Sequence, residues 1–548
     1  MAQQQDGGVS SLLPDIDPQD IEIRGDFEAR FPGLARQPVL GFSPRPAVFR
    51  VDPDRMPFME TDEEIVAAIP ISDLEPALRP EQNFIRFAER GKVYAYGGVG
   101  TFQSTEFQLF TETPIREDQS LAFHLGHQGS EGDREFSSFR DLKGELQWTR
   151  ASGNNRFGVG VSGASSYNYS PVPGPTSLLT DPERISHSSL GVKVRWQQLS
   201  NAYRGWQSSV ALYRFSNRAD VMPIQDDGTD ETRYHAHLNR FWEGTMTEQV
   251  FGIQVNATGS FYDTGLDKSQ YWLNNSIGAR YRHTLSSFHQ VEAWLRFFQL
   301  YDPANELDLY LYPDILYSYK GTGRFNAQLR LRGFVRDPSL ESIHMKNRFA
   351  MKKESELEHE RGLHINLHSG FDIWNRLELY SGLDYWQYYK RGYYSRWDDG
   401  SMPYYDFVYV DEAIHVEWYT GVSRVFRKWR TTTTAQVALN YTSVNKNVIP
   451  TGEIPYVPAW KGSIMVAATP LSRLDLSTWI DFSGKRKTET ADETIAGFFQ
   501  LGARCDLRIH SRFGIYFKAL NILDQEYEVW KDYQERPFQF YGGLTLHW

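Results

Sequence analysis

Hydrophobic and polar residues alternate one by one over long stretches of the chain between about Gly91 and Trp548. A two-residue period is typical of β-strands whose two faces meet different surroundings. The alternating segments run for about 9 to 13 residues, longer than the usual 5 to 6 of soluble sheets and suited to a tilted strand that crosses a bilayer. The clearest segment, 325–336, has Phe325, Ala327, Leu329, Leu331 and Val335 on one face and Asn326, Gln328, Arg330, Arg332 and Arg336 on the other.

The connections between these segments alternate in length. Tight links such as Thr469–Ser472 are interleaved with long polar excursions at 166–187, 216–231, 388–411, 443–460 and 483–497. Short turns at one rim and long loops at the other are typical of a transmembrane barrel. We predict an all-β fold, one large antiparallel transmembrane β-barrel of about 22 strands over residues 91–548. A soluble propeller or sandwich would also alternate and stays open as the alternative.

Aromatic residues make up 15% of the chain, with 31 Tyr, 34 Phe and 15 Trp, while no apolar run is long enough for a membrane-spanning helix. Many aromatic residues lie near the ends of the alternating segments, where rings with a polar tip suit the bilayer interface. Examples are Tyr310 and Tyr312, Tyr385 and Trp386, Tyr404 and Tyr405, and Trp418 and Tyr419. This placement favours the membrane barrel over the soluble fold.

The first 90 residues have a different composition from the rest. They contain 11 of the 26 prolines, 17 acidic residues, 9 arginines and no lysine, a net charge of 9 − 17 = −8 out of the −11 of the whole chain. Proline at this density blocks long helices and central strands. We interpret residues 1–90 as an extended acidic, proline-rich arm, with a partly disordered tail as the alternative.

The composition argues against several other classes of protein. A net charge of −11 disfavours a nucleic-acid binder, and the single Cys505 leaves no internal disulfide. No catalytic motif is present, so we predict no enzyme, no cofactor and no metal site. His364 and His368 share a strand face about 13 Å apart, too far to hold one ion, and we expect polar histidines that face the lumen. The first residues lack an export signal, which fits a mature exported chain.

The end of the chain carries the most specific motif. A strand, 513–520, runs into Asn521-Ile522-Leu523-Asp524-Gln525-Glu526-Tyr527, and a last strand ends in an aromatic residue. This resembles the closing hairpin of TonB-dependent outer-membrane receptors, with Ile522 and Leu523 at the Leu-Phe positions and without the Gly-Arg that follows the family's proline. The matching residues are Asn521, Asp524, Tyr527, Pro537, Gly542 and Trp548. From the residue types alone, Asn521 and Asp524 are expected to form turns.

The resemblance implies a bacterial outer-membrane barrel with the signal peptide removed, in contact with outer-membrane lipid and with partner proteins in the outer membrane or periplasm. Residues 1–90 lack the glycine-rich pattern of the family's plug domain, so the resemblance implies a receptor barrel without a plug and with residues 1–90 as a periplasmic arm. A bare barrel of about 22 strands would be a wide hole. The arm, infolded loops or a partner must then fill it, and Arg330, Arg332, Arg504 and Arg508 are candidates to pair with the acidic arm.

One polar excursion has the composition of a ligand- or partner-binding loop. Stacked aromatic rings supply contact area while interleaved charges fix orientation. The residues are Tyr388, Tyr389, Arg391, Tyr393, Tyr394, Arg396 and Trp397. An aromatic belt with a structured loop that closes the barrel is the alternative.

The predicted function is transport across the outer membrane, of a substrate that the sequence does not identify, or a role as a subunit of an outer-membrane complex. The alternative is a scaffold barrel that binds partner proteins through its N-terminal arm and its aromatic extracellular loops. A soluble all-β glycan-binding protein is a third class.

Overall fold

The computed structural model describes residues 93–548 except for short connecting segments. The predicted arm, residues 1–90, lies outside the described residues. The segments left out are 134–136, 170–183, 202–203, 220–227, 245–248, 264–268, 305, 322–323, 351–355, 375–376, 399–402, 427–429 and 492. Among the described residues, no helix is long and apolar enough to span a membrane.

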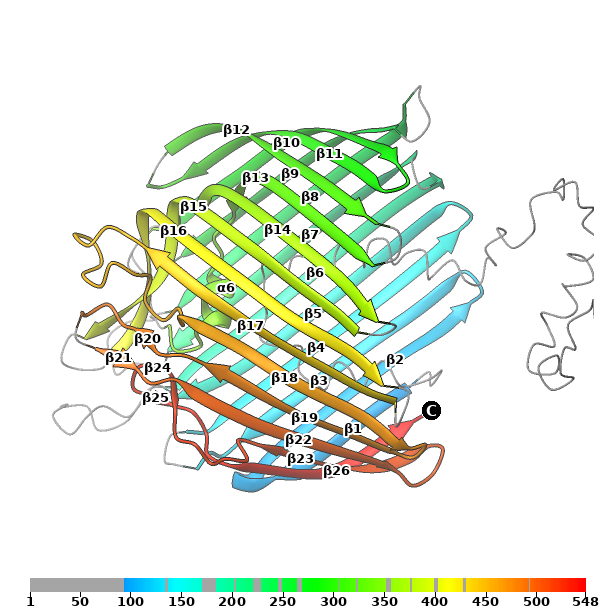
Figure 1. Ribbon diagram of the computed structural model, residues 1–548, viewed down its shortest axis with the longest axis vertical. Helices are drawn as coiled ribbons and strands as arrows, with labels where there is room; N and C mark the ends of the chain where they lie inside the picture. The colour runs from blue at the N-terminus through cyan, green and yellow to red at the C-terminus, as the bar shows by residue number, and fades with distance from the viewer. Residues whose placement is uncertain are drawn as a thin grey trace, which may run out of the picture. The chain divides into compact units, whose positions relative to one another are not determined.

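Twenty-two strands form one antiparallel sheet (Figure 1). They are β1 (Val93–Gly100), β2 (Ser104–Arg116), β3 (Gln119–Ser130), β4 (Phe139–Ser152), β5 (Asn155–Tyr169), β6 (Arg184–Asn201), β7 (Arg204–Ala219), β8 (Thr229–Glu243), β9 (Gln249–Asp263), β10 (Gln270–Ser286), β11 (His289–Asp302), β12 (Glu306–Lys320), β13 (Phe325–Arg336), β14 (Glu360–Trp374), β15 (Leu377–Asp398), β16 (Pro403–Phe426), β17 (Thr431–Ser443), β18 (Trp460–Leu471), β19 (Leu474–Ser483), β22 (Phe498–Arg508), β23 (Phe513–Leu520) and β26 (Gln539–His547).

The remaining described elements lie in the connections. They are η3 (Thr101–Gln103), α6 (Leu340–Lys346), β20 (Arg486–Lys487), β21 (Thr494–Ile495), β24 (Glu528–Trp530) and β25 (Tyr533–Gln534).

The sheet closes on itself because β1 pairs with both β2 and β26. In the closing pair, Gly97 lies opposite Leu544. On the lumen side near this seam, Lys518 and Tyr516 contact the buried carboxylate of Glu106 on β2, with the Tyr516 hydroxyl donating at 2.6 Å. The predicted barrel of about 22 strands is confirmed.

The two faces of each strand meet different surroundings, as the alternation predicts. On β13, Leu329 and Leu331 are exposed on the outer surface, while Arg330 on the lumen face is paired with Asp314. On β26, Leu544 and Leu546 are likewise exposed. An outer surface of exposed apolar side chains around a polar interior is that of a barrel that spans a bilayer.

His364 and His368 face the lumen from β14 and have separate partners. His364 Nε2 lies 2.6 Å from an Asp384 carboxylate oxygen, and His368 Nδ1 lies 3.1 Å from the Tyr419 hydroxyl. The prediction of polar histidines that face the lumen is confirmed. Cys505 lies on β22 in the same alternating register as Phe499 and Leu507, whose side chains are exposed on the outer surface. Cys505 therefore belongs to the outer face of that strand.

The connections separate into a short-turn end and a long-loop end. The short-turn end carries connections such as Glu117–Asp118 and Ser472–Arg473, together with the C-terminal residue Trp548. The long-loop end carries the connections 337–359, 444–459, 484–497 and 521–538. The predicted excursion at 388–411 is wrong as a loop: β15 continues to Asp398 and β16 starts at Pro403, so the two strands form a hairpin that extends past its neighbours.

The family-like motif after β23 forms a turn. Asn521 and Asp524 adopt left-handed backbone conformations with φ of 47° and 48°. The Asn521 side chain accepts the backbone N–H of Gln525 at 3.1 Å and donates to the Arg536 carbonyl at 3.0 Å. The Asp524 carboxylate accepts the N–H of Phe538 at 2.8 Å. Both residues are turn formers, as predicted.

Candidate functional site

The connection between β13 and β14, residues 337–359, packs against lumen-facing side chains of distant strands. We call it the infolded segment; its residues 351–355 are not described. It begins with α6, whose N-cap residue Ser339 accepts the backbone N–H of Ser342 at 3.3 Å. Leu340 and Ile343 are buried on one side of this short helix, whereas Met345 is 71% exposed on the other.

Glu231, buried on β8, fixes the start of the segment. Its carboxylate accepts hydrogen bonds from the Ser339 hydroxyl at 3.1 Å and from the Glu341 backbone N–H at 3.3 Å. Ser260 on β9 donates to its other oxygen at 2.9 Å. Arg233, two residues along β8, pairs with the Glu341 side chain at 3.2 Å. One wall of the barrel therefore holds the first turn of α6 through several charge-assisted bonds.

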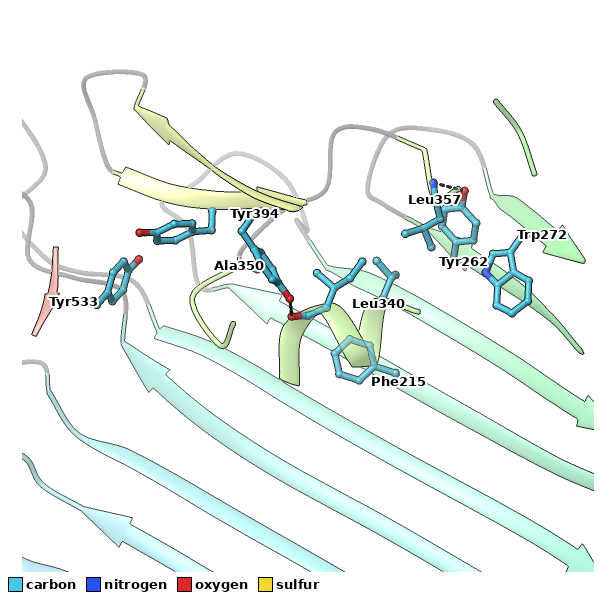
Figure 2. Close-up of a cluster of buried hydrophobic side chains, with 10 residues drawn as sticks. Phe215, Tyr262, Trp272, Leu340, Ala350, Leu357, Tyr394 and Tyr533 are labelled. Carbon is cyan, nitrogen blue, oxygen red and sulfur yellow. Dashed lines mark hydrogen bonds between the residues drawn. The ribbon is translucent and has the colours of Figure 1, made fainter. Parts of the chain in front are cut away.

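An apolar cluster joins the segment to both sides of the barrel (Figure 2). Leu340 and Ile343 of α6 belong to it, and the Tyr394 hydroxyl of β15 donates to the Ile343 carbonyl at 2.6 Å. The other members come from β7, β9, β10, β15, β16, β25 and the segment itself: Phe215, Tyr262, Trp272, Tyr394, Tyr405, Tyr533, Ala350 and Leu357. Because strands β7–β10 and β15–β16 lie far apart in the sheet order, the segment crosses the lumen.

His344 packs against the wall at the far side of α6. Its ring lies 5.5 Å from the Phe215 ring and 5.3 Å from the His187 ring of β6, and its Nε2 lies 3.3 Å from the Asn217 amide nitrogen. Burial lowers the pKa of His344 to about 3, with the neighbouring His187 adding to the effect. The contact is therefore made by a neutral imidazole at ordinary pH.

The last residues of the segment return along the β9–β11 wall. The backbone N–H of Leu357 donates to the Tyr262 hydroxyl at 3.1 Å, and the His359 N–H donates to Asp302 at 3.4 Å. His359 Nε2 also lies 3.1 Å from the Leu273 carbonyl. Both ends of the segment are thus held on lumen-facing groups.

Other connections of the long-loop end join one another around Arg396 of β15. Its guanidinium pairs with Asp532 at 2.6 Å, and its backbone N–H donates to Glu489. The Tyr456 hydroxyl donates to the same Glu489 carboxylate at 3.1 Å. Burial raises the pKa values of Glu489 and Tyr456. Three connections, 444–459, 484–497 and 521–538, therefore meet at one strand end.

The structure does not gather the predicted ligand-binding residues into one pocket. Tyr388 and Tyr394 are buried, Tyr389 is exposed, and the Arg391 guanidinium donates to the Tyr388 hydroxyl at 2.6 Å. Arg396 takes part in the junction of connections described above. Tyr393 is half-buried, and Trp397 lies in β15 near the tip of the hairpin. A ligand or partner role for these residues stays a prediction.

The predicted lumen arginines have partners in the barrel wall. Arg330 makes a bidentate pair with Asp314 at 2.8 Å, and Arg504 makes one with Asp506 at 2.8 and 2.9 Å. Arg508 lies 4.0 Å from Asp475, and Arg332 donates to His364 at 3.0 Å. Any pairing of these arginines with the arm lies outside the described residues.

One stretch of the lumen wall is open. A recess of about 210 Å³ on β4–β7 has Glu145 on one side and Lys193 and Arg195 on the other. Its floor on β5 is formed by small residues such as Gly160 and Ser162. Glu145, Lys193 and Arg195 form no ion pair with any other residue that the structure describes. Glu145 and Arg195 are exposed, so water reaches the charged groups of this wall.

Comparison with solved structures gives the fold. The barrel superposes on a mutant of the ferric enterobactin receptor PfeA of Pseudomonas aeruginosa with a TM-score of 0.64 at 11% identity, over 84% of this chain and 80% of that chain. It superposes on the FrpB iron transporter of Neisseria meningitidis (F3-3 variant) with a TM-score of 0.66 at 7% identity, over 85% and 83%. The barrel has the fold of the TonB-dependent receptors.

The copper transporter OprC is a third structure with this receptor fold, with a TM-score of 0.62 at 10% identity over 83% of this chain and 80% of that chain. No protein-family model and no curated protein matches the sequence. The receptor fold agrees with the resemblance of the C-terminal hairpin, whose specific motif spans residues 513–548.

Infolded loops are one of the three fillers expected from the sequence, but the pattern did not identify residues 337–359 or their anchors, Glu231 and His344. A signal for α6 is present in the sequence, because Ser339 precedes Leu340, Ile343 and His344 at helical spacing inside an otherwise alternating pattern. The anchors carry no such signal, since Glu231 lies more than 100 residues from Ser339 along the chain.

Proposed function

We propose that this protein is a transport barrel of the bacterial outer membrane and that the infolded segment closes its lumen. One observation carries the proposal: residues 337–359 cross from the β7–β10 wall to β15–β16 and bury Leu340, Ile343, Ala350 and Leu357 there. In this proposal the segment takes the place of a plug and the long-loop end faces outward. The barrel has no catalytic step to perform.

The receptor fold supports transport, because the similar structures are described as receptors and transporters of iron complexes and copper. The charged groups of the recess on β4–β7 are on β4 and β6, whereas the hydrogen bonds that hold α6 come from β8 and β15. Charged walls of this kind suit a polar solute. We place the solute path along this wall once the segment has moved.

Single-channel conductance of the full-length chain in a planar bilayer tests the closure. Leu340→Asn places an amide inside the apolar cluster and weakens the segment without touching the strands. We expect long-lived large openings from this variant and near silence from the wild type. Met345→Asn changes the exposed side of the same helix and serves as the matched control, with wild-type behaviour expected.

Silence of Leu340→Asn, in a barrel shown to be folded by a shift in its gel migration on boiling, would contradict the closure. That result would favour the alternative function, a scaffold barrel that binds partner proteins. The junction of connections around Arg396 favours this alternative, since it fixes an ordered surface at the long-loop end.

A further inference from the structure

A recess of about 500 Å³ lies at the ends of β1–β5 that adjoin the long-loop end, and we call it the outer recess. Six of the residues that line it share the outer face of the barrel: Val99, Thr105, His127, Gly129, Arg140 and Tyr167. All of them except His127 form a single row across the five paired strands. Gly129 lies in the middle of this row, and its lack of a side chain leaves space between its neighbours.

The outer recess opens away from the lumen. Val99 is 68% exposed, and Arg140 is exposed as well. On the lumen side the ends of the same strands are covered, because Ser130 and Phe139 are buried. The Arg536 guanidinium lies 3.5 Å from the centre of the Phe139 ring on that side. The space of the recess is therefore reached from the surface that faces lipid.

The row lies at one limit of the apolar band of the outer surface. On β5, Phe157 and Tyr167 lie ten residues apart, with the exposed Val161 between them. Ten residues of a strand tilted by about 40° rise by about 25 Å, which is the height of the apolar band of such barrels. Phe157 lies beside the short turn Gly153–Asn154, so Tyr167 marks the limit nearest the long-loop end. With the long-loop end facing outward, this is the level of the headgroups of the outer leaflet.

This part of the outer surface carries positive charge. Arg140 and Arg184 lie on the two strands that flank Tyr167, and the Arg184 guanidinium lies 4.3 Å from the centre of the Tyr167 ring. Both arginines are exposed. None of the described residues at outer-face positions of β2–β7 is acidic. Glu131, on the connection after β3, is the only acidic residue among those that line the recess. The surface therefore favours an anion.

The lining of the recess is polar at a depth that acyl chains would otherwise occupy. The Thr105 hydroxyl and His127 Nε2 lie 3.0 Å apart, and Gln103 lines the recess with them. Hydrocarbon offers no hydrogen-bond partner to these groups or to Arg140. A phosphate group does, and a guanidinium binds two of its oxygens at once.

We propose that the outer recess binds the phosphorylated headgroup of a lipid of the outer leaflet. Arg140 and Arg184 hold the phosphate from the two sides of Tyr167. The acyl chains lie against the apolar surface below, where Leu142 follows Arg140 on the same face of β4 and is exposed. The position on the outer face selects a membrane lipid over a solute in the lumen, and the charge selects an anionic one. The inference rests on the outward orientation in the proposed function and is independent of transport.

Native mass spectrometry of the full-length chain in detergent tests this site, with lipid A, a diphosphorylated glycolipid, as the probe. Arg140→Gln combined with Arg184→Gln removes both guanidinium groups. Arg240→Gln is the matched control, because Arg240 is also exposed on the outer face and lies 4.5 Å from the centre of the Trp206 ring, but near the short-turn end. A shift in gel migration on boiling confirms that each barrel is folded.

We expect the wild type and Arg240→Gln to bind the lipid, and the double variant to bind at least about tenfold less. Lipid A without its phosphates should bind the wild type at least about tenfold less as well. Equal binding of the two lipids, equal loss in the control and the double variant, or no binding to the wild type would each overturn the proposal. Release of the lipid by inorganic phosphate at equal concentration would assign the recess to a free anion instead. A protein that purifies with the wild type in place of lipid would assign it to a protein partner.

Labelling of intact cells separates a failure of this site from a failure of the orientation on which it rests. Val448→Cys in a Cys505→Ala background places a thiol on the connection 444–459, where Val448 is exposed. A membrane-impermeant maleimide labels this thiol on intact cells if the long-loop end faces outward. Labelling without lipid binding would overturn the lipid site alone, whereas no labelling would overturn the orientation and the site together.

Discussion

Two parts of the lumen wall differ in how their charges are held. On β10–β15 many of the described charges have an opposite neighbour, as in Arg280 with Glu292 at 2.7 Å and Arg361 with Asp308 at 3.0 Å. On β4–β6, Glu145, Lys193 and Arg195 line an open recess without ion pairs to other described residues. The charges of the first wall stabilise the fold, whereas those of the second could contact a solute in the proposed transport function.

The infolded segment follows the same division. It is anchored on β7–β11 and β15–β16 and reaches β6 only through His187, near the long-loop end of that strand. The wall with paired charges therefore makes most of the contacts that hold the infolded segment. The wall with the open recess needs no rearrangement when the infolded segment moves. We therefore expect variants of one wall to change closure and variants of the other to change ion selectivity.

The largest effect is expected from Glu231→Ala. This change removes a buried carboxylate that accepts bonds from Ser339, Glu341 and Ser260, and we expect a loss of about 3 kcal/mol of segment anchoring. Tryptic cleavage after the exposed Lys346 should then rise about 100-fold, because cleavage follows the released population. Glu145→Ala on the open wall is the control and should leave cleavage unchanged; an equal rise in both variants would remove the distinction between the walls.

The next effect is a pH dependence of closure. Burial holds the pKa of His344 at about 3, whereas a released segment returns it to about 6.5. Above pH 6.5 the His344 imidazole is neutral in both the closed and the released state, so closure has its full stability there. As the pH falls from 6.5 toward 3, only the released state takes up the proton, and the open fraction should rise by up to about tenfold per pH unit. Channel recordings at pH 7.5 and 5.5 measure it.

His344→Gln removes this titration and serves as the comparison for the pH series. The Gln variant should show a weaker pH dependence than the wild type, with His187 as the remaining titratable ring at the contact. Identical pH dependence in both would assign the effect to other groups.

The smallest effect is expected on ion selectivity. In the Leu340→Asn background, Lys193→Glu with Arg195→Glu should shift the permeability ratio several-fold from anions toward cations, because these side chains line the open recess. Arg330→Gln changes a charge on the paired wall and should shift the ratio far less. Reversal potentials in a salt gradient distinguish the two, and a larger shift from Arg330→Gln would place the path on the other wall.

The fold was predictable from the sequence because each strand carries its own signal. Leu329 and Arg330 sort to opposite faces by a period of two, and Asn521 and Asp524 mark their turn by residue type. The proposed closure was not predictable, because it depends on contacts between residues far apart in the chain. Glu231 and Ser339 meet only once the barrel has brought β8 beneath the β13–β14 connection.

The segment 388–411 shows the limit of composition as a guide. Its tyrosines and arginines look like a binding loop, but Tyr394 packs on the infolded segment and Arg396 joins the connections of the long-loop end. Strand pairing between Arg391 and Val410 continues the β15–β16 hairpin through a stretch whose polarity alone predicts a loop.

A reversible tether of the infolded segment tests the central claim most directly. Ala350 and Tyr405 form an isolated β-bridge, so cysteines at these positions are close enough for a disulfide. The variant carries Ala350→Cys and Tyr405→Cys with Leu340→Asn, and Cys505→Ala removes the native thiol. The account predicts large channel openings when the disulfide is reduced and near silence when it is oxidised. Equal conductance in both states would show that residues 337–359 do not close the lumen.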